Sequence, residues 1–192
     1  KQFLGMLGMH GTYEANNAMH DCDLMINIGA RFDDRITGKI DQFSPKSKKI
    51  HIDIDPSSIN KNVKVDIALV GDVKLVLEKF VSIIKQKYPD FGNSNKQKIA
   101  AWWSQIENWR KKNSLSYINS REVIKPQFAV QRLYELTKAQ DVFITTEVGQ
   151  HQMWAAQHYK FDKPNRWMTS GGLGTMGYGL PAAVGVQVAN PD

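Results

Sequence analysis

Residues 23–29 (DLMINIG) form a short apolar run that ends in glycine, which is the pattern of a buried strand. Residues 50–55 (IHIDID) alternate strictly, with three isoleucines on one face and a histidine and two aspartates on the other. A third apolar run, 67–70, is followed by Gly-Asp. Helices are expected at 12–21 and 73–87, and in the second of these apolar residues recur at helical spacing. This alternation predicts an α/β fold in which parallel sheets are flanked by helices.

The rest of the chain predicts a second α/β unit that begins near residue 126. The composition of 89–95 (PDFGNSN) is typical of a loop, a helix is expected at 96–112, and 113–125 is a polar linker. Beyond the linker we expect helices at 128–138, 149–158 and 180–189, strands at 142–146 and 167–169, and a glycine-rich loop at 170–179.

Charge argues against a nucleic-acid partner. The 192 residues carry 25 Lys and Arg against 19 Asp and Glu, a formal charge of +6. The excess is spread thinly along the chain, whereas a phosphate-binding surface needs a cluster of basic residues. We therefore attribute the basic balance to composition and solubility.

The single cysteine, Cys22, excludes an internal disulfide framework and a multi-thiolate metal site. No apolar run approaches the ~20 residues of a membrane span, so no membrane partner is expected. The chain opens at Lys1 without a methionine and stops at residues 190–192 (NPD), where a helix would end. We therefore expect an internal piece of a longer protein.

Two stretches of the first half have the residue types of a ligand site. Residues 8–12 (GMHGT) lead into a helix, whose N-terminus offers free N–H groups, although glycine before a helix is more often only a turn. Asp53, at the end of a strand, stands where nucleotide ribose is often bound, but a turn cap before Pro56 is the simpler explanation. Residues 29–35 (GARFDDR) place two arginines and two acids after a strand, which fits either an anion site or a surface salt-bridge cluster.

A long glycine-rich string stands in the second half. Residues 170–183 (SGGLGTMGYGLPAA) hold five glycines in their first ten positions and run into a helix of small residues. The string lacks the Gly-Lys-Ser/Thr of a Walker loop. Small side chains there permit the backbone to pack closely around a cofactor.

These motifs together carry a family resemblance. Residues 146–154 (TEVGQHQMW), followed by the glycine-rich string, resemble the cofactor domain of thiamine-diphosphate enzymes. Residues 7–11 (LGMHG) and 29–35 resemble the acetolactate synthase (acetohydroxyacid synthase) large-subunit family in particular. The resemblance implies that residues 1–120 are the C-terminal part of a central Rossmann-like FAD-binding domain. It also implies that residues 121–192 open a thiamine-diphosphate-binding domain.

The resemblance also implies roles for particular residues. FAD would be bound by His10, Gly11, Gly29, Arg31, Asp34, Asp53, Ile54 and Asp72. Thiamine diphosphate would be bound by Val148, Gly149, Gln150, His151, Met153, Gly174 and Met176, the last of which would support the cofactor in its bent form. Met9 and Arg35 would face the second substrate as catalytic-site residues, with Arg35 paired to its carboxylate.

The implied reaction decarboxylates pyruvate and condenses the product with a second 2-oxoacid, pyruvate or 2-oxobutyrate, in branched-chain amino-acid biosynthesis. The family needs Mg²⁺, but its metal ligands and its activating glutamate fall outside this chain, so we expect no metal site here and no activity from this piece alone. The family also implies a homodimer or homotetramer with the active site at the subunit interface, and a small regulatory subunit. The compartment would be cytoplasmic in a bacterium and an organelle in a eukaryote.

Other functions remain open from the sequence. Within the thiamine-diphosphate enzymes the alternatives are pyruvate oxidase, glyoxylate carboligase and an oxoacid decarboxylase, against which Arg35 argues. A redox flavoprotein or nicotinamide dehydrogenase would leave the string at 170–183 unexplained. A non-catalytic nucleotide-binding module is a further alternative.

Overall fold

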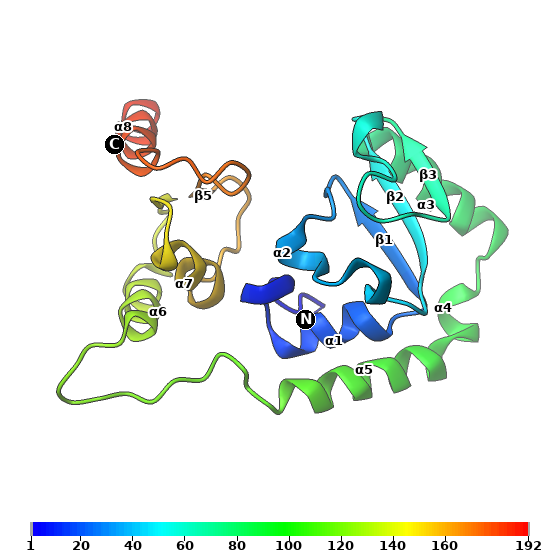
Figure 1. Ribbon diagram of the computed structural model, residues 1–192, viewed down its shortest axis with the longest axis horizontal. Helices are drawn as coiled ribbons and strands as arrows, with labels where there is room; N and C mark the ends of the chain where they lie inside the picture. Colours follow the sequence, from blue (N-terminus) through cyan, green and yellow to red (C-terminus); the bar gives the residue numbers. More distant parts are fainter. Residues whose placement is uncertain (1, 192) are drawn as a thin grey trace. The chain divides into compact units, whose positions relative to one another are not determined.

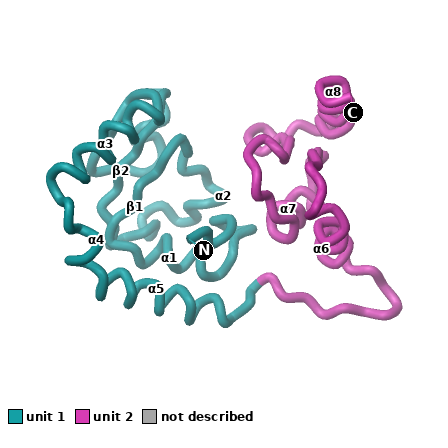
Figure 2. Tube along the Cα trace, turned by 180° about the vertical axis from the view of Figure 1, so that it is seen from behind, with its two compact units in different colours: residues 1–114 teal, residues 115–192 magenta. Residues whose placement is uncertain are grey.

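The computed structural model describes residues 2–191, and the chain divides into two compact units, residues 1–114 and 115–192 (Figures 1 and 2). The boundary lies within the polar stretch that the sequence predicts as a linker, and no helix or strand is present between residues 111 and 125. Each unit is described by itself below.

The first unit is built on a parallel sheet of three strands, β1 (Leu24–Ile28), β2 (Lys48–Asp53) and β3 (Ile67–Val70), in the order β1-β2-β3. Ile26 pairs with Ile50, and Ile50 pairs in turn with Ile67. The carboxyl ends of all three strands therefore meet at one edge of the sheet. The predicted parallel α/β architecture is confirmed.

Helices flank this sheet. Their bounds are η1 (Gly8–His10), α1 (Tyr13–Asp21), α2 (Asp34–Thr37), η2 (Ile40–Gln42), η3 (Pro56–Ser58), α3 (Val73–Lys87), α4 (Phe91–Ser94) and α5 (Lys96–Arg110). Helix α1 packs against α5, whereas α3 lies against β2 (Figure 1). The prediction of a pure loop at 89–95 is wrong, because backbone N–H groups of Ser94 and Asn95 donate to Asp90 and Phe91 and close a short helix.

The core of the first unit is aromatic and contains one histidine. Phe32 stacks edge-on against Phe43 at 5.7 Å and against His51 at 5.2 Å between ring centroids, with Val63 beside them. Both His51 and its neighbour Ile52 are fully buried, because both faces of this strand are covered. The strand ends at Asp53, earlier than predicted, because the Asp55 carboxylate accepts the Ser57 N–H and starts η3.

The second unit contains α6 (Pro126–Thr137), β4 (Ile144–Thr145), α7 (Gln150–His158), β5 (Trp167–Met168) and α8 (Gly179–Ala189). Strands β4 and β5 pair in parallel, and α6 packs against α7. Both strands are shorter than predicted, because each pairs with a single partner within residues 115–191. Aromatic rings in successive contact pack this unit: Tyr134 meets Tyr159 edge-on, Tyr159 lies tilted against Phe161, and Phe161 stacks on Trp167. In residues 2–191 no helix combines the length and apolar character needed to cross a membrane.

Candidate functional site

Two loops of the first unit meet where the sequence predicts substrate contacts. Gly8 has φ +85°, and a Cβ atom there would lie 2.2 Å from the carbonyl oxygen of Arg35. Only glycine permits this approach. Elements η1 and α2 are thereby in contact, so Met9 and Arg35 lie on neighbouring elements. Both side chains are exposed, Met9 at 66% and Arg35 at 70%.

The first of these loops is held by an amide side chain of α1. Asn16 Oδ1 accepts the Gly8 N–H at 2.8 Å, and Asn16 Nδ2 donates to the Gly8 carbonyl at 2.9 Å. Thr12 caps α1 by accepting the Ala15 N–H and donates its hydroxyl to the Leu4 carbonyl. Gly11 has no room for a side chain, because a Cβ would lie 2.3 Å from the Met6 carbonyl oxygen. The tight packing therefore explains two of the glycines without a ligand.

The second loop, residues 29–35, is also held by side chains that lie outside it. Asn27 Nδ2 donates to the Ala30 carbonyl at 2.6 Å, and Asn62 Nδ2 donates to the Phe32 carbonyl at 2.9 Å. Phe32 adopts φ +51° and inserts its ring into the core. Asp33 caps α2 by accepting the Arg35 N–H at 3.0 Å. The loop conformation thus depends on anchors at Ala30, before the first arginine, and at Phe32 and Asp33, between the two arginines.

The charged side chains of this loop pair with one another at the surface. Arg31 Nε lies 3.4 Å from Asp33, and Arg35 lies 3.9 Å from Asp34. The second pair is long and exposed on both sides, so it contributes little stability. The guanidinium of Arg35 consequently remains available to a carboxylate ligand.

The carboxyl edge of the sheet brings together four of the residues predicted to contact a cofactor: Gly29, Asp53, Ile54 and Asp72. Gly29 has φ +60° with open space where a Cβ would stand, and Ile54 is 71% exposed. Asp53 is mostly buried, with Oδ1 accepting the Asp55 N–H and Oδ2 3.6 Å from His51.

Asp72 has a structural role of its own at this edge. Its Oδ1 accepts the N–H groups of Lys74 and Leu75 and so caps α3. Capping of α3 is therefore enough to explain an aspartate at this position, without a cofactor contact.

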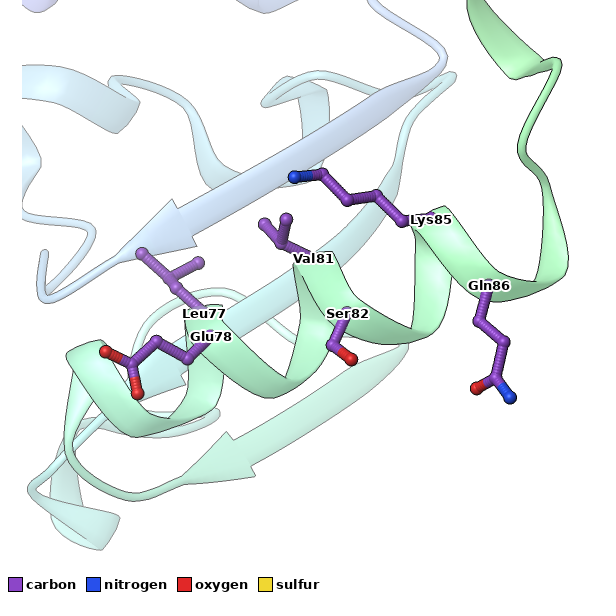
Figure 3. Close-up of a pocket in the computed structure, with 6 residues that line it drawn as sticks. All are labelled: Leu77, Glu78, Val81, Ser82, Lys85 and Gln86. Carbon is purple, nitrogen blue, oxygen red and sulfur yellow. The ribbon is translucent and has the colours of Figure 1, made fainter.

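Several hollows lie in the first unit. One lies between residues 21–24 and helices α4 and α5, and it is lined by none of the predicted site residues that the structure describes. An apolar cavity of about 480 Å³ opens between α1, β1 and the loop at 29–35, and Arg31 and Asp33 stand at its polar side. A shallower hollow lies along α3, where Leu77 and Val81 point toward the sheet and Glu78 and Gln86 point away (Figure 3). The hollow on α3 is lined by none of the predicted site residues among those described. The cavity beside the loop is therefore the better candidate for a ligand.

In the second unit the motif at 146–154 turns from β4 into α7 through Gly149, whose φ is +151°. Val148 Cγ1 lies 3.8 Å from the position of a Cβ on Gly174, so the motif and the glycine-rich loop are in van der Waals range. Gln150 and His151 stand exposed at the first turn of α7, and Met153 is half-buried. Some of the residues predicted to contact thiamine diphosphate therefore lie close together, where the motif meets the glycine-rich loop.

Glu147 holds the far end of the glycine-rich loop, a role that the sequence did not predict. Its carboxylate accepts the N–H of Gly177 at 2.8 Å and the N–H of Gly179 at the start of α8. These N–H groups stabilise the charged form, so the pKa of Glu147 lies below its ordinary value. A Cβ on Gly179 would lie 2.8 Å from the Glu147 backbone nitrogen, so only glycine fits.

Gln152 holds the near end of the same loop and was also missed. Its buried amide donates to Thr169 Oγ1 at 2.6 Å and to the Ser170 carbonyl at 3.2 Å. Thr146 Oγ1 donates to the same Thr169 oxygen at 2.7 Å. These contacts span 17 to 23 residues, and no local pattern in the sequence predicts them.

The loop between these anchors presents apolar side chains outward. Leu173 is 91% exposed and Met176 is 80% exposed, and the positive φ values of Gly174 and Gly177 flank the methionine. A backbone fixed at both ends that exposes large apolar groups is suited to contact a ring system. Among residues 2–191, no group of three or more His, Cys, Asp or Glu side chains is placed to hold a metal ion.

The comparisons with known proteins cover both units. Residues 1–80 match the model described as "Thiamine pyrophosphate enzyme, central domain". Residues 147–192 match "Thiamine pyrophosphate enzyme, C-terminal TPP binding domain". The two matches stand in the order that the sequence motifs predict.

Curated relatives match along the whole chain. It is 51% identical over 192 residues to the acetolactate synthase large subunit of Haemophilus influenzae, and 50% identical over 192 residues to the acetolactate synthase isozyme 3 large subunit of Escherichia coli. It is 46% identical over 190 residues to the large subunit of the alga Cyanidium caldarium. These alignments cover 99–100% of the chain but 32–33% of each relative, so the chain spans about a third of their length. The resemblance predicted from the motifs is confirmed.

Proposed function

Because the chain is a homologue of acetolactate synthase large subunits along its whole length, we propose that it works as part of such a subunit. That subunit condenses pyruvate, after decarboxylation, with pyruvate or 2-oxobutyrate to give acetolactate or acetohydroxybutyrate for valine, leucine and isoleucine synthesis. The observation that carries the proposal is that the similarity runs unbroken through both units.

We place thiamine diphosphate in the second unit, as the opening part of a cofactor domain at residues 121–192. When bound, this cofactor supplies the electron sink that allows a 2-oxoacid to lose carbon dioxide. The residues present fit it, since the loop is anchored at both ends and exposes Met176 beside Gly174. The contacts would come from Val148, Gly149, Gln150, His151, Met153, Gly174 and Met176.

We place FAD in the first unit, as the C-terminal part of a Rossmann-like central domain at residues 1–120. The open space at Gly29 and the exposure of Ile54, at the carboxyl edge of a parallel sheet, fit a flat ligand. The contacts would come from His10, Gly11, Gly29, Arg31, Asp34, Asp53, Ile54 and Asp72. Asp72 would have to do this while its Oδ1 caps α3.

We assign Arg35 and Met9 to the second substrate. An arginine guanidinium forms two parallel hydrogen bonds with a carboxylate, and every 2-oxoacid carries one. The contact between Gly8 and the Arg35 carbonyl keeps the two side chains on adjoining elements. Arg35 would orient the acceptor acid and Met9 would provide an apolar wall beside it.

The remaining assignments also follow the family. Mg²⁺ would be bound by residues outside this chain, and the subunit would form a homodimer or homotetramer with the active site between copies. A small regulatory subunit would bind the assembly. The enzyme would work in the cytoplasm of a bacterium or in an organelle of a eukaryote.

The test is product analysis on the full-length subunit supplied with pyruvate, thiamine diphosphate, Mg²⁺ and FAD. We expect acetolactate, with a loss of roughly a hundredfold in kcat/KM for Arg35→Ala, the cost of removing a charge-assisted pair. The matched control is Arg132→Ala, which removes a surface arginine of α6 paired with Glu135. Acetaldehyde, or acetyl phosphate with peroxide, as the main product would overturn the synthase assignment. Unchanged turnover of Arg35→Ala would overturn the role of Arg35.

A further inference from the structure

Helix α8 begins without a cap of its own. Its N-cap residue is Tyr178, whose side chain makes no capping hydrogen bond. The first N–H groups of a helix need acceptors from elsewhere. Here the N–H of Gly179, the first residue of α8, and the N–H of Gly177, just before the N-cap, both donate to the carboxylate of Glu147. Glu147 follows β4 and lies about thirty residues earlier in the chain.

A carboxylate suits this place better than a neutral acceptor. Its two oxygens separately accept the N–H groups of Gly177 and Gly179, and its negative charge faces the positive end of the helix dipole. An amide of the same shape offers one oxygen and one donor, so it would satisfy a single N–H and oppose the other.

One of these hydrogen bonds acts directly on Met176. The N–H of Gly177 belongs to the peptide group whose carbonyl is that of Met176, so the bond to Glu147 orients the plane that follows the methionine. Glycines with φ +65° and +84° stand at 174 and 177, so this segment is otherwise free to adopt other conformations. On the N-terminal side of Met176, the Thr175 N–H donates to Ser170 Oγ and restricts the conformation of the loop there.

We propose that Glu147 is a positioning residue, which holds the peptide after Met176 and the start of α8 so that Met176 is presented to thiamine diphosphate. The positioning role rests on the proposed function, because it assumes that thiamine diphosphate binds here. The hydrogen bonds between Glu147 and the loop do not depend on that assumption. Glu147 acts through the loop and takes no part in the chemistry.

The first experiment needs no cofactor. Hydrogen exchange in the full-length subunit without added ligand should show protected N–H groups at Gly177 and Gly179. In Glu147→Ala their exchange should accelerate roughly tenfold, and in Glu147→Gln by a smaller factor. Glu135→Ala, a surface glutamate of α6, is the matched control and should leave both amides unchanged. If these amides of the unaltered protein exchange at the rate of an unstructured glycine, the hydrogen bonds from the loop to Glu147 are rejected without any variant.

The second experiment measures the cofactor. The concentration of thiamine diphosphate that gives half-maximal activity should rise roughly tenfold in Glu147→Gln, while the KM for pyruvate changes less than twofold. A purely structural role would lower the melting temperature and leave half-saturation where it was, and that result would overturn the positioning role.

The outcomes separate the two proposals. If the activity of the unaltered enzyme does not depend on thiamine diphosphate, the proposed function is rejected, and so is the presentation of Met176 to that cofactor. The hydrogen-exchange data still show in that case whether Glu147 holds the loop. An unaltered enzyme that requires the cofactor, together with a Glu147→Gln variant of equal half-saturation, would reject the positioning role alone.

Discussion

Each unit carries a glycine loop whose backbone N–H groups donate to a side chain of a neighbouring element, but the two accepting side chains differ in kind. The loop at 8–11 is held by the neutral amide of Asn16, which both accepts from and donates to Gly8. The far end of the loop at 170–179 is held by the carboxylate of Glu147, which accepts from two N–H groups. The backbone groups that the loop leaves unpaired therefore decide which side chain can hold it.

The largest effect should come from filling the tight contact in the first loop. Gly8→Ala places a Cβ 2.2 Å from the Arg35 carbonyl at a φ of +85°, so we expect a loss of more than about 2 kcal/mol in the free energy of unfolding. Urea unfolding followed by circular dichroism measures it. Gly185→Ala is the control, since it lies in α8 with open space around its Cβ and should be neutral or stabilising by up to ~1 kcal/mol. Equal effects at both glycines would contradict the close packing.

The second prediction removes the neutral anchor. Asn16→Ala leaves the N–H and carbonyl of Gly8 without their partner and should cost about 1–3 kcal/mol in unfolding free energy. Asn16→Asp keeps an acceptor for the N–H but turns a negative charge toward the Gly8 carbonyl, so it should not rescue the loss. Asn17→Ala, whose amide bonds only within α1, is the control and should cost less. A stable Asn16→Asp protein would show that the donor half of the contact is unimportant.

The third prediction is that only the loop held by a carboxylate responds to acid pH. The pKa of Glu147 is lowered from its ordinary 4.5, first by the Gly179 N–H and then by that of Gly177, so the bound form is the charged one. Its stabilisation is complete above pH 4.5 and is lost as pH falls through the lowered pKa. Amide chemical shifts of Gly177 and Gly179 should therefore move in acid, below pH 4.5, whereas the amide of Gly8 should follow no such titration. Movement of Gly177 and Gly179 near neutral pH would contradict the assignment.

The smallest effect should come from a surface pair in the second unit. Arg166 makes two hydrogen bonds to Asp141, at 2.8 and 3.0 Å, and Lys163 adds a third contact, which together lower the pKa of Asp141 to about 2. The stabilisation is present above the ordinary pKa of 3.8 and disappears as pH falls through about 2. Asp141→Asn should lower the melting temperature slightly at pH 7 and not at all near pH 1.5. A difference that persists in strong acid would point to packing and not to charge.

Periodicity predicted the fold well where a segment is long. The helix at 73–87 was predicted with its observed bounds, because apolar residues recur there at helical spacing. The structure adds that Asp72 caps it. Short elements were less accurate, as at α4 and at the two-residue strands β4 and β5. A few residues carry too little pattern, and their state depends on hydrogen bonds to other segments.

The sequence by itself determined the α/β class, the order of the elements, the glycine motifs and the family they indicate. These are local properties, since they depend on residue types at short spacing. Only the tertiary structure revealed that Asn16, Glu147 and Gln152 hold the loops on which those motifs stand. Their partners are 8 to 32 residues away, and a hydrogen bond across such a separation is decided by how the chain packs.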